Sequence, residues 1–206
     1  MPSELLLASA SPRRAALLRG LGVRFRQIPS GAGEEHDGAD PAASAAEVAL
    51  RKALKVAESH PLDVVIGADT VVVAPDGQPM GKPRDGGEAL GMLMRLAGRT
   101  HRVVTGVALV GPAGRRTGVE TTLVRMRRFG RDEAERYVRS GEPLDKAGAY
   151  GIQGRGGLLV AGIEGCYFNV VGLPITLLYG MLTECGAAGE WLGPDPNAHE
   201  AGQGSG

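Results

Sequence analysis

The sequence predicts a mixed α/β or α+β domain built on one large sheet with helices packed against it. Apolar extended segments and amphipathic segments follow one another irregularly, with both hairpin signals and single helices. A length of 206 residues suffices for one substantial domain. Because no internal repeat or interdomain linker is visible, we expect one folded unit over residues 1–185 and a disordered Gly/Pro-rich tail over residues 186–206.

The first strand and helix form the most informative stretch of the chain. Residues 5–8 are apolar, and Ser11 with Pro12 has the residue types of an N-cap and a first helical position. The free amides and positive dipole end of this helix point back at the loop. Such a strand, loop and helix can bind an anion, although a capped helix with surface arginines fits the same segment. The loop adds a hydroxyl and two positive charges, from Ser9, Arg13 and Arg14.

The middle of the chain predicts a second helix, a buried strand and a turn. Asp40 as N-cap with Pro41 at the first helical position predicts a helix that ends near residue 58. The apolar run at 64–73 predicts a buried strand, and the Pro-Asp-Gly turn after it predicts a short returning strand at 78–82.

Two helices flank the predicted central hairpin. Residues 85–96 and 131–140 are amphipathic, and a glycine that can end a helix follows each of them. Residues 102–110 and 118–127 predict two long strands joined across a Gly-Pro-Ala-Gly turn.

The last third continues with a glycine-rich loop at 145–157. We expect extended segments at 158–163 and 166–171, on either side of a Glu-Gly turn, and a final helix from Pro174 to about residue 184.

Composition excludes several classes of partner. The net charge is zero, so no global basic field favours nucleic acid or an anionic membrane. Only 4% of the residues are aromatic, which disfavours stacking on single strands. No apolar stretch has the length of a membrane span or of a signal peptide. The two isolated cysteines fit a reducing compartment, and we expect a cytoplasmic protein.

Asp69 is the second signal, because aspartate is disfavoured in strands and this one lies inside an apolar run. A buried carboxylate needs a cationic partner or a function. A structural capping aspartate fits the same pattern.

Two lysines and two glutamates are candidate partners of this carboxylate. Lys52 lies on the helix stripe of the residues four before and four after it, and Lys82 stands in an extended Gly-Lys-Pro segment. Either could instead be a surface lysine. Glu34 and Glu35 occupy a glycine-flanked loop and, together with Asp69, could supply oxygen ligands for Mg²⁺ or Mn²⁺.

The third signal is the segment 145–154, Asp-Lys-Ala-Gly-Ala-Tyr-Gly-Ile-Gln-Gly. Its small residues suit a backbone that wraps closely around a ligand, and an unliganded loop is the alternative. The amide of Gln153 offers donors and an acceptor that can match the edge of a base.

Taken together, these segments resemble the Maf (septum formation protein) family over about residues 4–184. The matching motifs are Ala-Ser-Ala-Ser-Pro-Arg-Arg at 8–14, Gly-Ala-Asp-Thr-Val-Val at 67–72, Gly-Lys-Pro at 81–83, Thr-Gly-Val at 105–107, the segment 145–154, and Val-Gly-Leu-Pro at 171–174. The resemblance implies an inosine-triphosphatase-like (Maf/Ham1) fold, a large mixed twisted sheet with a central cleft.

The resemblance implies a metal-dependent nucleoside triphosphate pyrophosphatase, a hydrolase that acts on acid anhydrides. The Gly-Ala-Asp-Thr form with Gln153 is similar to the subfamily that hydrolyses dTTP and UTP to the monophosphate and pyrophosphate. Roles in nucleotide-pool sanitation and cell-division arrest, and a homodimer, are implied in the same way. The alternatives are the sister activity on 7-methyl-GTP and a non-catalytic nucleotide-binding regulator of septum formation.

Carried over by position, the resemblance makes Asp69 the proton acceptor, and it ties Arg13, Thr70 and Gln153 to substrate choice. The remaining expected active-site positions are Ser9, Glu34, Lys52 and Lys82, with Glu34 and Asp69 as metal ligands and Glu35 as the alternative to Glu34.

Overall fold

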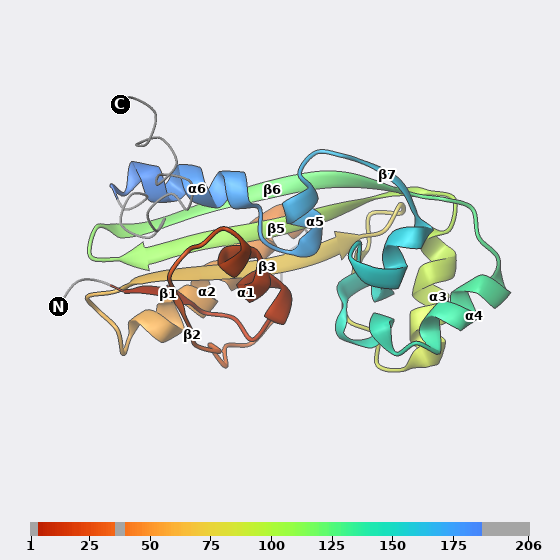
Figure 1. Cartoon of the computed structure of the whole chain (residues 1–206), viewed down its shortest axis with the longest axis horizontal. Helices are drawn as coiled ribbons and strands as arrows, with labels where there is room; N and C mark the ends of the chain where they lie inside the picture. The colour runs from red at the N-terminus through yellow and green to blue at the C-terminus, as the bar shows by residue number, and fades with distance from the viewer. Residues whose placement is uncertain (1–3, 36–39, 187–206) are drawn as a thin grey trace, which may run out of the picture.

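A computed structural model describes residues 4–35 and 40–186, and it contains the expected mixed sheet with helices on both faces (Figure 1). Of the tail predicted at 186–206, residues 187–206 lie outside the described residues, so the tail stays a prediction. Residues 36–39, which follow Glu34 and Glu35, also lie outside them. The strands are β1 (Leu5–Leu7), β2 (Arg26–Gln27), β3 (Val64–Val73), β4 (Pro79–Met80), β5 (Thr100–Gly111), β6 (Gly114–Met126) and β7 (Val160–Glu164). The α-helices are α1 (Pro12–Gly20), α2 (Pro41–Ala57), α3 (Gly86–Leu96), α4 (Arg131–Val138), α5 (Tyr167–Val171) and α6 (Ile175–Glu184).

The sheet is mixed because its first strands run parallel and the others are antiparallel. Its order is β2-β1-β3-β5-β6-β7, with β4 paired to β3. β1 pairs in parallel with both β2 and β3, whereas β3, β5, β6 and β7 form antiparallel pairs. The long hairpin of β5 and β6 turns across Gly111 and Gly114, as the Gly-Pro-Ala-Gly signal predicts.

Side-chain alternation along β1 places the core on both faces of the sheet. Leu5 and Leu7 pack in the cluster that includes residues of α1 and α6, whereas Leu6 packs in the cluster that includes α2. A strand buried on both faces reads as an unbroken apolar run, which is what residues 5–8 show. The carboxyl end of β1 therefore lies between two helical layers.

A separate core lies at the far end of the long strands. There α3 and α4 pack with the outer ends of β3, β5 and β6, around buried residues such as Leu93 and Met126 (Figure 1). The expected glycine-rich loop also lies here, as three short 3₁₀ helices, η1 (Glu142–Asp145), η2 (Ala147–Ala149) and η3 (Gly154–Leu159). Among the described helices, none has both the length and the apolar character needed to cross a bilayer.

The expectation of an extended segment at 166–171 is wrong, because this segment forms the short helix α5. A brief apolar run does not separate a strand from a buried helix by periodicity. Tertiary contacts decide the matter here. The side-chain nitrogen Nδ2 of the buried Asn169 donates to the backbone oxygen of Val103 at 3.0 Å and to Thr122 Oγ1 at 2.9 Å. These hydrogen bonds connect α5 to β5 and β6.

Candidate active site

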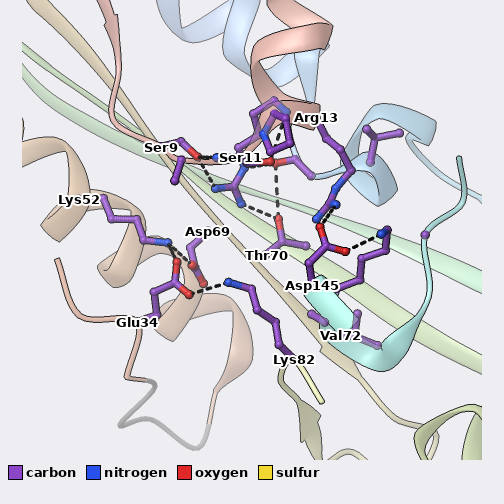
Figure 2. Close-up of a pocket in the computed structure, with 18 of the residues that line it drawn as sticks. Ser9, Ser11, Arg13, Glu34, Lys52, Asp69, Thr70, Val72, Lys82 and Asp145 are labelled. Atoms are coloured by element: carbon purple, nitrogen blue, oxygen red, sulfur yellow. Dashed lines mark hydrogen bonds and ion pairs between the residues drawn. The ribbon is translucent and has the colours of Figure 1, made fainter. Parts of the chain in front are cut away.

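A cavity of about 500 Å³ opens beside the carboxyl end of β1 and the middle of β3. Its lining comes from five stretches of chain that are far apart in the sequence and from three single residues (Figure 2). The stretches lie within residues 8–14, 29–34, 69–72, 145–153 and 170–172, and the single residues are Lys52, Lys82 and Val103. All eight site residues expected from the sequence line this cavity: Ser9, Arg13, Glu34, Lys52, Asp69, Thr70, Lys82 and Gln153.

The start of α1 forms one wall. Ser11 is the N-cap, and its hydroxyl accepts a hydrogen bond from the backbone amide of Arg14. Pro12 occupies the first turn, and the hydroxyl of Ser9 accepts from the amide of Ser11 at 3.1 Å. The amino end of the helix, with its partial positive charge, therefore faces the cavity as the sequence predicts.

The two arginines of this helix have different partners. Arg14 is buried, and its Nε donates to the backbone oxygen of Gly172 at 2.7 Å. Its Nη1 donates to the backbone oxygen of Ala68 at 2.8 Å, and its Nη2 donates to Thr70 Oγ1 at 3.1 Å. Arg14 thus joins α1 to β3 and to the loop before α6. From the sequence, Arg13 and Arg14 are two equivalent positive charges. The structure distinguishes them, because Arg14 is buried and Arg13 pairs with Asp145.

Arg13 lines the cavity next to Asp145. Its Nη1 donates to Asp145 Oδ2 at 2.8 Å, and Lys146 Nζ donates to the other oxygen of the same carboxylate at 2.6 Å. This bridge connects the amino end of α1 to η1 (Figure 2). Asp145 is exposed, so its ion pair with Arg13 is of the weak, solvent-screened kind.

The opposite wall carries a linked group of two lysines and two carboxylates, which we call the lysine–carboxylate cluster. Lys52 Nζ lies 2.7 Å from Asp69 Oδ1 and 2.7 Å from Glu34 Oε1. Lys82 Nζ lies 3.2 Å from Glu34 Oε2. Lys52 and Asp69 are each only 4% exposed, so the buried carboxylate expected to need a cation has one in Lys52 (Figure 2).

Close packing of α2 on the sheet positions this cluster. Asp69 of β3 pairs with Gly106 of β5, and a Cβ atom at Gly106 would lie 2.3 Å from the backbone of Ala45. Only glycine allows this approach. Lys52 lies two turns further along α2 and thereby reaches Asp69.

The structure brings Glu34, and not Glu35, to the cavity. Glu35 is exposed and pairs with Arg51 at 3.8 Å on the outer surface. Partial burial opposes ionisation of Glu34, but hydrogen bonds and charge from Lys52 and Lys82 outweigh it and lower its pKa to about 2. Glu34 is therefore a carboxylate at any physiological pH.

Besides Arg13, the two other residues tied to substrate choice lie on different supports. Thr70 stands in β3, where its Oγ1 lies 3.0 Å from Thr105 Oγ1 and accepts from Arg14. Gln153 is exposed on the cavity wall, in the segment between η2 and η3.

The donor set is compatible with a divalent cation that the substrate helps to bind. Across residues 4–35 and 40–186, no group of three or more acidic, histidine or cysteine side chains could enclose a metal ion. Glu34 and Asp69 offer two carboxylates that Lys52 bridges. Mg²⁺ commonly binds to one or two carboxylates and takes its other ligands from phosphates and water. These two residues would hold it.

Comparison with known proteins decides the family. The sequence profile described as "Maf-like protein" matches residues 4–185. The chain belongs to the Maf family. The resemblance seen in the motifs is therefore confirmed, and the matched range covers nearly all of the residues that the structure describes.

The similarity to relatives in the Maf family extends over nearly the full length of each relative. A protein of Symbiobacterium thermophilum is 49% identical over 89% of this chain and 94% of the relative, and one of Moorella thermoacetica is 51% identical over 87% and 94%. A protein of Deinococcus radiodurans is 46% identical over 91% and 98%. All three are named dTTP/UTP pyrophosphatase. The solved structure of the Ham1 protein of Staphylococcus aureus matches with a TM-score of 0.52 over 88% of this chain and 99% of that one, at 16% identity, which supports the expected fold.

Proposed function

We propose that this protein hydrolyses nucleoside triphosphates, dTTP and UTP above all, to the nucleoside monophosphate and pyrophosphate. The observation that carries the proposal is the buried Lys52–Asp69 pair on the wall of a cavity that also contains the amino end of α1. Maf relatives at 44–51% identity that are named dTTP/UTP pyrophosphatase support the choice of substrates.

The cavity provides positive groups at three places around a polyphosphate. Lys52 and Lys82 lie on one wall, and the opposite wall carries Arg13 and the amino end of α1 with its partial positive charge. Lys82 and Arg13 are now paired with the exposed carboxylates of Glu34 and Asp145. Exposed ion pairs contribute little stability, so phosphate oxygens can replace these partners at small cost.

Asp69 is the residue we assign to the water molecule. In the proposed reaction a water oxygen attacks the α-phosphorus, the bond from that phosphorus to the α–β bridging oxygen breaks, and pyrophosphate leaves with the bond electrons. Asp69 accepts the proton that the water loses, and Lys52 orients the carboxylate through the 2.7 Å contact. A divalent cation at Glu34 and Asp69 would neutralise charge that develops on the phosphates.

Gln153 is the residue we assign to the base. Its amide can pair with a carbonyl oxygen and an N–H of uracil or thymine, whereas cytosine presents a different donor pattern. A bound base would cover this amide, and a base with the wrong pattern would leave its donor and acceptor unpaired, which discriminates against that base. Thr70 and Arg13 are the other positions we assign to substrate choice. From the family resemblance we also propose a homodimer that acts on the cytoplasmic nucleotide pool.

Product analysis over a nucleotide panel tests this function. We expect UTP and dTTP to yield monophosphate and pyrophosphate with Mg²⁺ or Mn²⁺, and to react faster than CTP and the purine triphosphates. In ¹⁸O-labelled water the label should enter the monophosphate, because attack is at the α-phosphorus. Diphosphate with orthophosphate would contradict the proposed bond cleavage. Preference for 7-methyl-GTP would favour the sister activity, and nucleotide binding without turnover would favour a regulator.

Replacing Gln153 by Ala tests the base assignment separately. We expect kcat/KM for UTP and dTTP to fall by about 10-fold, with little change for CTP, because a hydrogen-bonded pair is lost only with the preferred bases. Equal losses on all nucleotides would show that Gln153 does not read the base.

A further inference from the structure

The segment that carries Gln153 belongs neither to a β-strand nor to an α-helix, so no regular backbone hydrogen bonds of those elements hold it in place. Gln153 adopts an extended backbone between η2 and η3, both of which are short 3₁₀ helices. Its exposed side chain projects from a surface segment at the cavity wall. The position of its amide therefore depends on contacts that other parts of the chain make with the backbone on either side.

A single carboxylate binds the backbone that follows Gln153. Glu142 Oε2 accepts from the amide of Arg155 at 3.1 Å, and Oε1 accepts from the amide of Gly156 at 3.0 Å. Both amides belong to the first turn of η3, whose N-cap is Gln153 itself. Glu142 thus binds the amino end of η3 in the way that an N-capping carboxylate does.

Tyr137 connects this carboxylate to the backbone that precedes Gln153. Its hydroxyl donates to Glu142 Oε1 at 2.9 Å and accepts from the amide of Gly151 at 3.3 Å. The amides on both sides of Gln153 are therefore hydrogen-bonded to one connected pair of side chains. We call Tyr137 and Glu142 the Tyr–Glu clamp.

The backbone lies so close to the clamp that a side chain would not fit. A Cβ atom at Gly156 would lie 2.3 Å from the backbone oxygen of Gly151 and 2.6 Å from Tyr137 Oη. The two ends of the segment are therefore in direct contact over the tyrosine hydroxyl. Such contact fixes the loop between them, because neither end can move without the other.

The electrostatics of the clamp favour the ionised glutamate. Burial opposes ionisation of Glu142, but the hydrogen bonds from Gly156, Tyr137 and Arg155 and the charge of Lys146 outweigh it and lower its pKa. Burial, together with the neighbouring Glu142, raises the pKa of Tyr137, so its hydroxyl remains a donor. The clamp keeps these protonation states at neutral pH.

Neither clamp residue is part of the cavity wall. Tyr137 packs in the core formed with α3, and Glu142 begins η1, whereas the wall in this region consists of residues 145–147 and 150–153. None of their hydrogen bonds reaches Asp69, Lys52 or Glu34. We therefore expect the clamp side chains to affect the reaction through the backbone of residues 151–156.

We propose that Tyr137 and Glu142 are positioning residues for base selection, which hold the Gln153 amide at the place where it meets the nucleobase. This inference rests on the role proposed above for Gln153. We expect the clamp to act on discrimination between bases and not on the phosphate chemistry, because the Tyr137 hydroxyl and the Glu142 carboxylate accept hydrogen bonds from the backbone amides of residues 151, 155 and 156.

Two conservative substitutions test the clamp. Glu142→Gln keeps the shape but turns an NH₂ group toward one of the two backbone amides, and Tyr137→Phe keeps the ring but removes the oxygen that Gly151 uses. We expect the ratio of kcat/KM for UTP over CTP to fall by about 10-fold in Glu142→Gln and by less in Tyr137→Phe. The double variant should lose less than the product of the single losses, because both act on one network.

Glu135→Gln is the matched control. Glu135 lies on α4 like Tyr137, but its carboxylate pairs with Arg131 of the same helix at 3.8 Å. We expect its UTP over CTP ratio to equal that of the wild type.

Product inhibition provides a readout that a merely structural defect would not reproduce. In Glu142→Gln the inhibition constant of UMP should rise about 10-fold while that of inorganic pyrophosphate stays unchanged. Equal losses for all nucleotides, or a parallel rise for pyrophosphate, would overturn the inference, and so would an unchanged ratio in a folded variant. If Glu142→Gln does not fold, Tyr137→Phe decides by the same criteria.

The two proposals fail in different ways. Absence of turnover or of pyrimidine preference in the wild type would contradict the proposed function. Calorimetric binding of UMP and of pyrophosphate to the same variants would still test the clamp, since it needs no turnover.

Discussion

On one side of the cavity, Lys52 and Asp69 project from a helix of 17 residues and a strand of 10 residues, whereas on the other side Gln153 stands between 3₁₀ helices of 3 and 6 residues. The first side, which we call the phosphate side, is fixed by regular hydrogen-bond ladders and close helix–sheet packing. The second, the base side, is fixed by individual hydrogen bonds to Tyr137 and Glu142.

This difference indicates how the two tasks are divided. Proton transfer needs a carboxylate held within a narrow range of positions, and a central strand supplies that. Base selection depends on which groups meet one edge of a ring, and a loop can change them without disturbing the core. Substitutions on the phosphate side should therefore affect all nucleotides, and substitutions on the base side should change the preference among them.

Asp69→Asn should disable the phosphate side. The change keeps the shape and removes the negative charge that accepts the proton, so we expect kcat to fall by about two to three orders of magnitude on every nucleotide. Equilibrium binding of UTP and the melting temperature, measured in parallel, should stay close to the wild type. A variant that keeps most of its activity would rule out Asp69 as the base, and Glu34 would be the next candidate.

Gly106→Ala should disturb the support of the phosphate side. The added methyl group would lie 2.3 Å from the backbone of Ala45, so α2 must move outward, and we expect the free energy of unfolding to fall by about 1–3 kcal/mol with loss of activity. Denaturant titration measures this. Gly91→Ala in α3 is the control, because no atom apart from its chain neighbours and the nearby backbone of its own helix lies within 4 Å of the new Cβ, and alanine favours a helix. An equally mild effect at both positions would show that α2 is not tightly packed here.

Arg13→Ala and Lys82→Ala decide to which side Arg13 belongs. If both side chains contact phosphates, kcat/KM should fall by about 10-fold on all nucleotides alike. Lys82 serves as the reference, because its ion pair with Glu34 belongs to the lysine–carboxylate cluster on the phosphate side. Since Arg13 also pairs with Asp145 of the base side, a changed order of preference among bases in Arg13→Ala would assign it to base selection.

Acidification should weaken the base side before the phosphate side. Burial lowers the pKa of His101 to about 4, and His101 Nε2 lies 2.9 Å from the hydroxyl of Tyr150, which precedes Gly151. In the unfolded chain His101 has a pKa of about 6.5, so below that pH it is protonated there while it stays neutral in the folded protein. The free energy of unfolding therefore decreases as pH falls from 6.5 toward 4. We expect a loss of about 1–2 kcal/mol at pH 5.

Unfolding midpoints measured between pH 7 and pH 4.5 in the wild type and in His101→Gln test this, and the slope should be shallower in the variant. The pairs of Glu34 on the phosphate side persist to far lower pH, because its pKa is about 2. Equal slopes in the two proteins would show that His101 is not the group that titrates.

Much of the site was predictable because its residues violate local expectations. Asp69 inside an apolar strand, Lys52 on a helix stripe and Ser11 with Pro12 before a helix each differ from what a simple core or surface would contain. The exact partners were not predictable. The sequence offers Glu34 and Glu35 side by side, and only the path of the loop sends one to Lys52 and the other to Arg51.

Hydrophobic periodicity and capping residues act over short distances, so local patterns were enough to predict the fold class and most strands and helices. The family motifs then pointed to the eight site residues that line the cavity. Only contacts within the folded chain made residues 167–171 helical, buried Arg14 while Arg13 pairs with Asp145, and joined Tyr137 and Glu142 to the segment that carries Gln153. These outcomes depend on hydrogen bonds between segments distant in the chain, whose geometry no local pattern encodes.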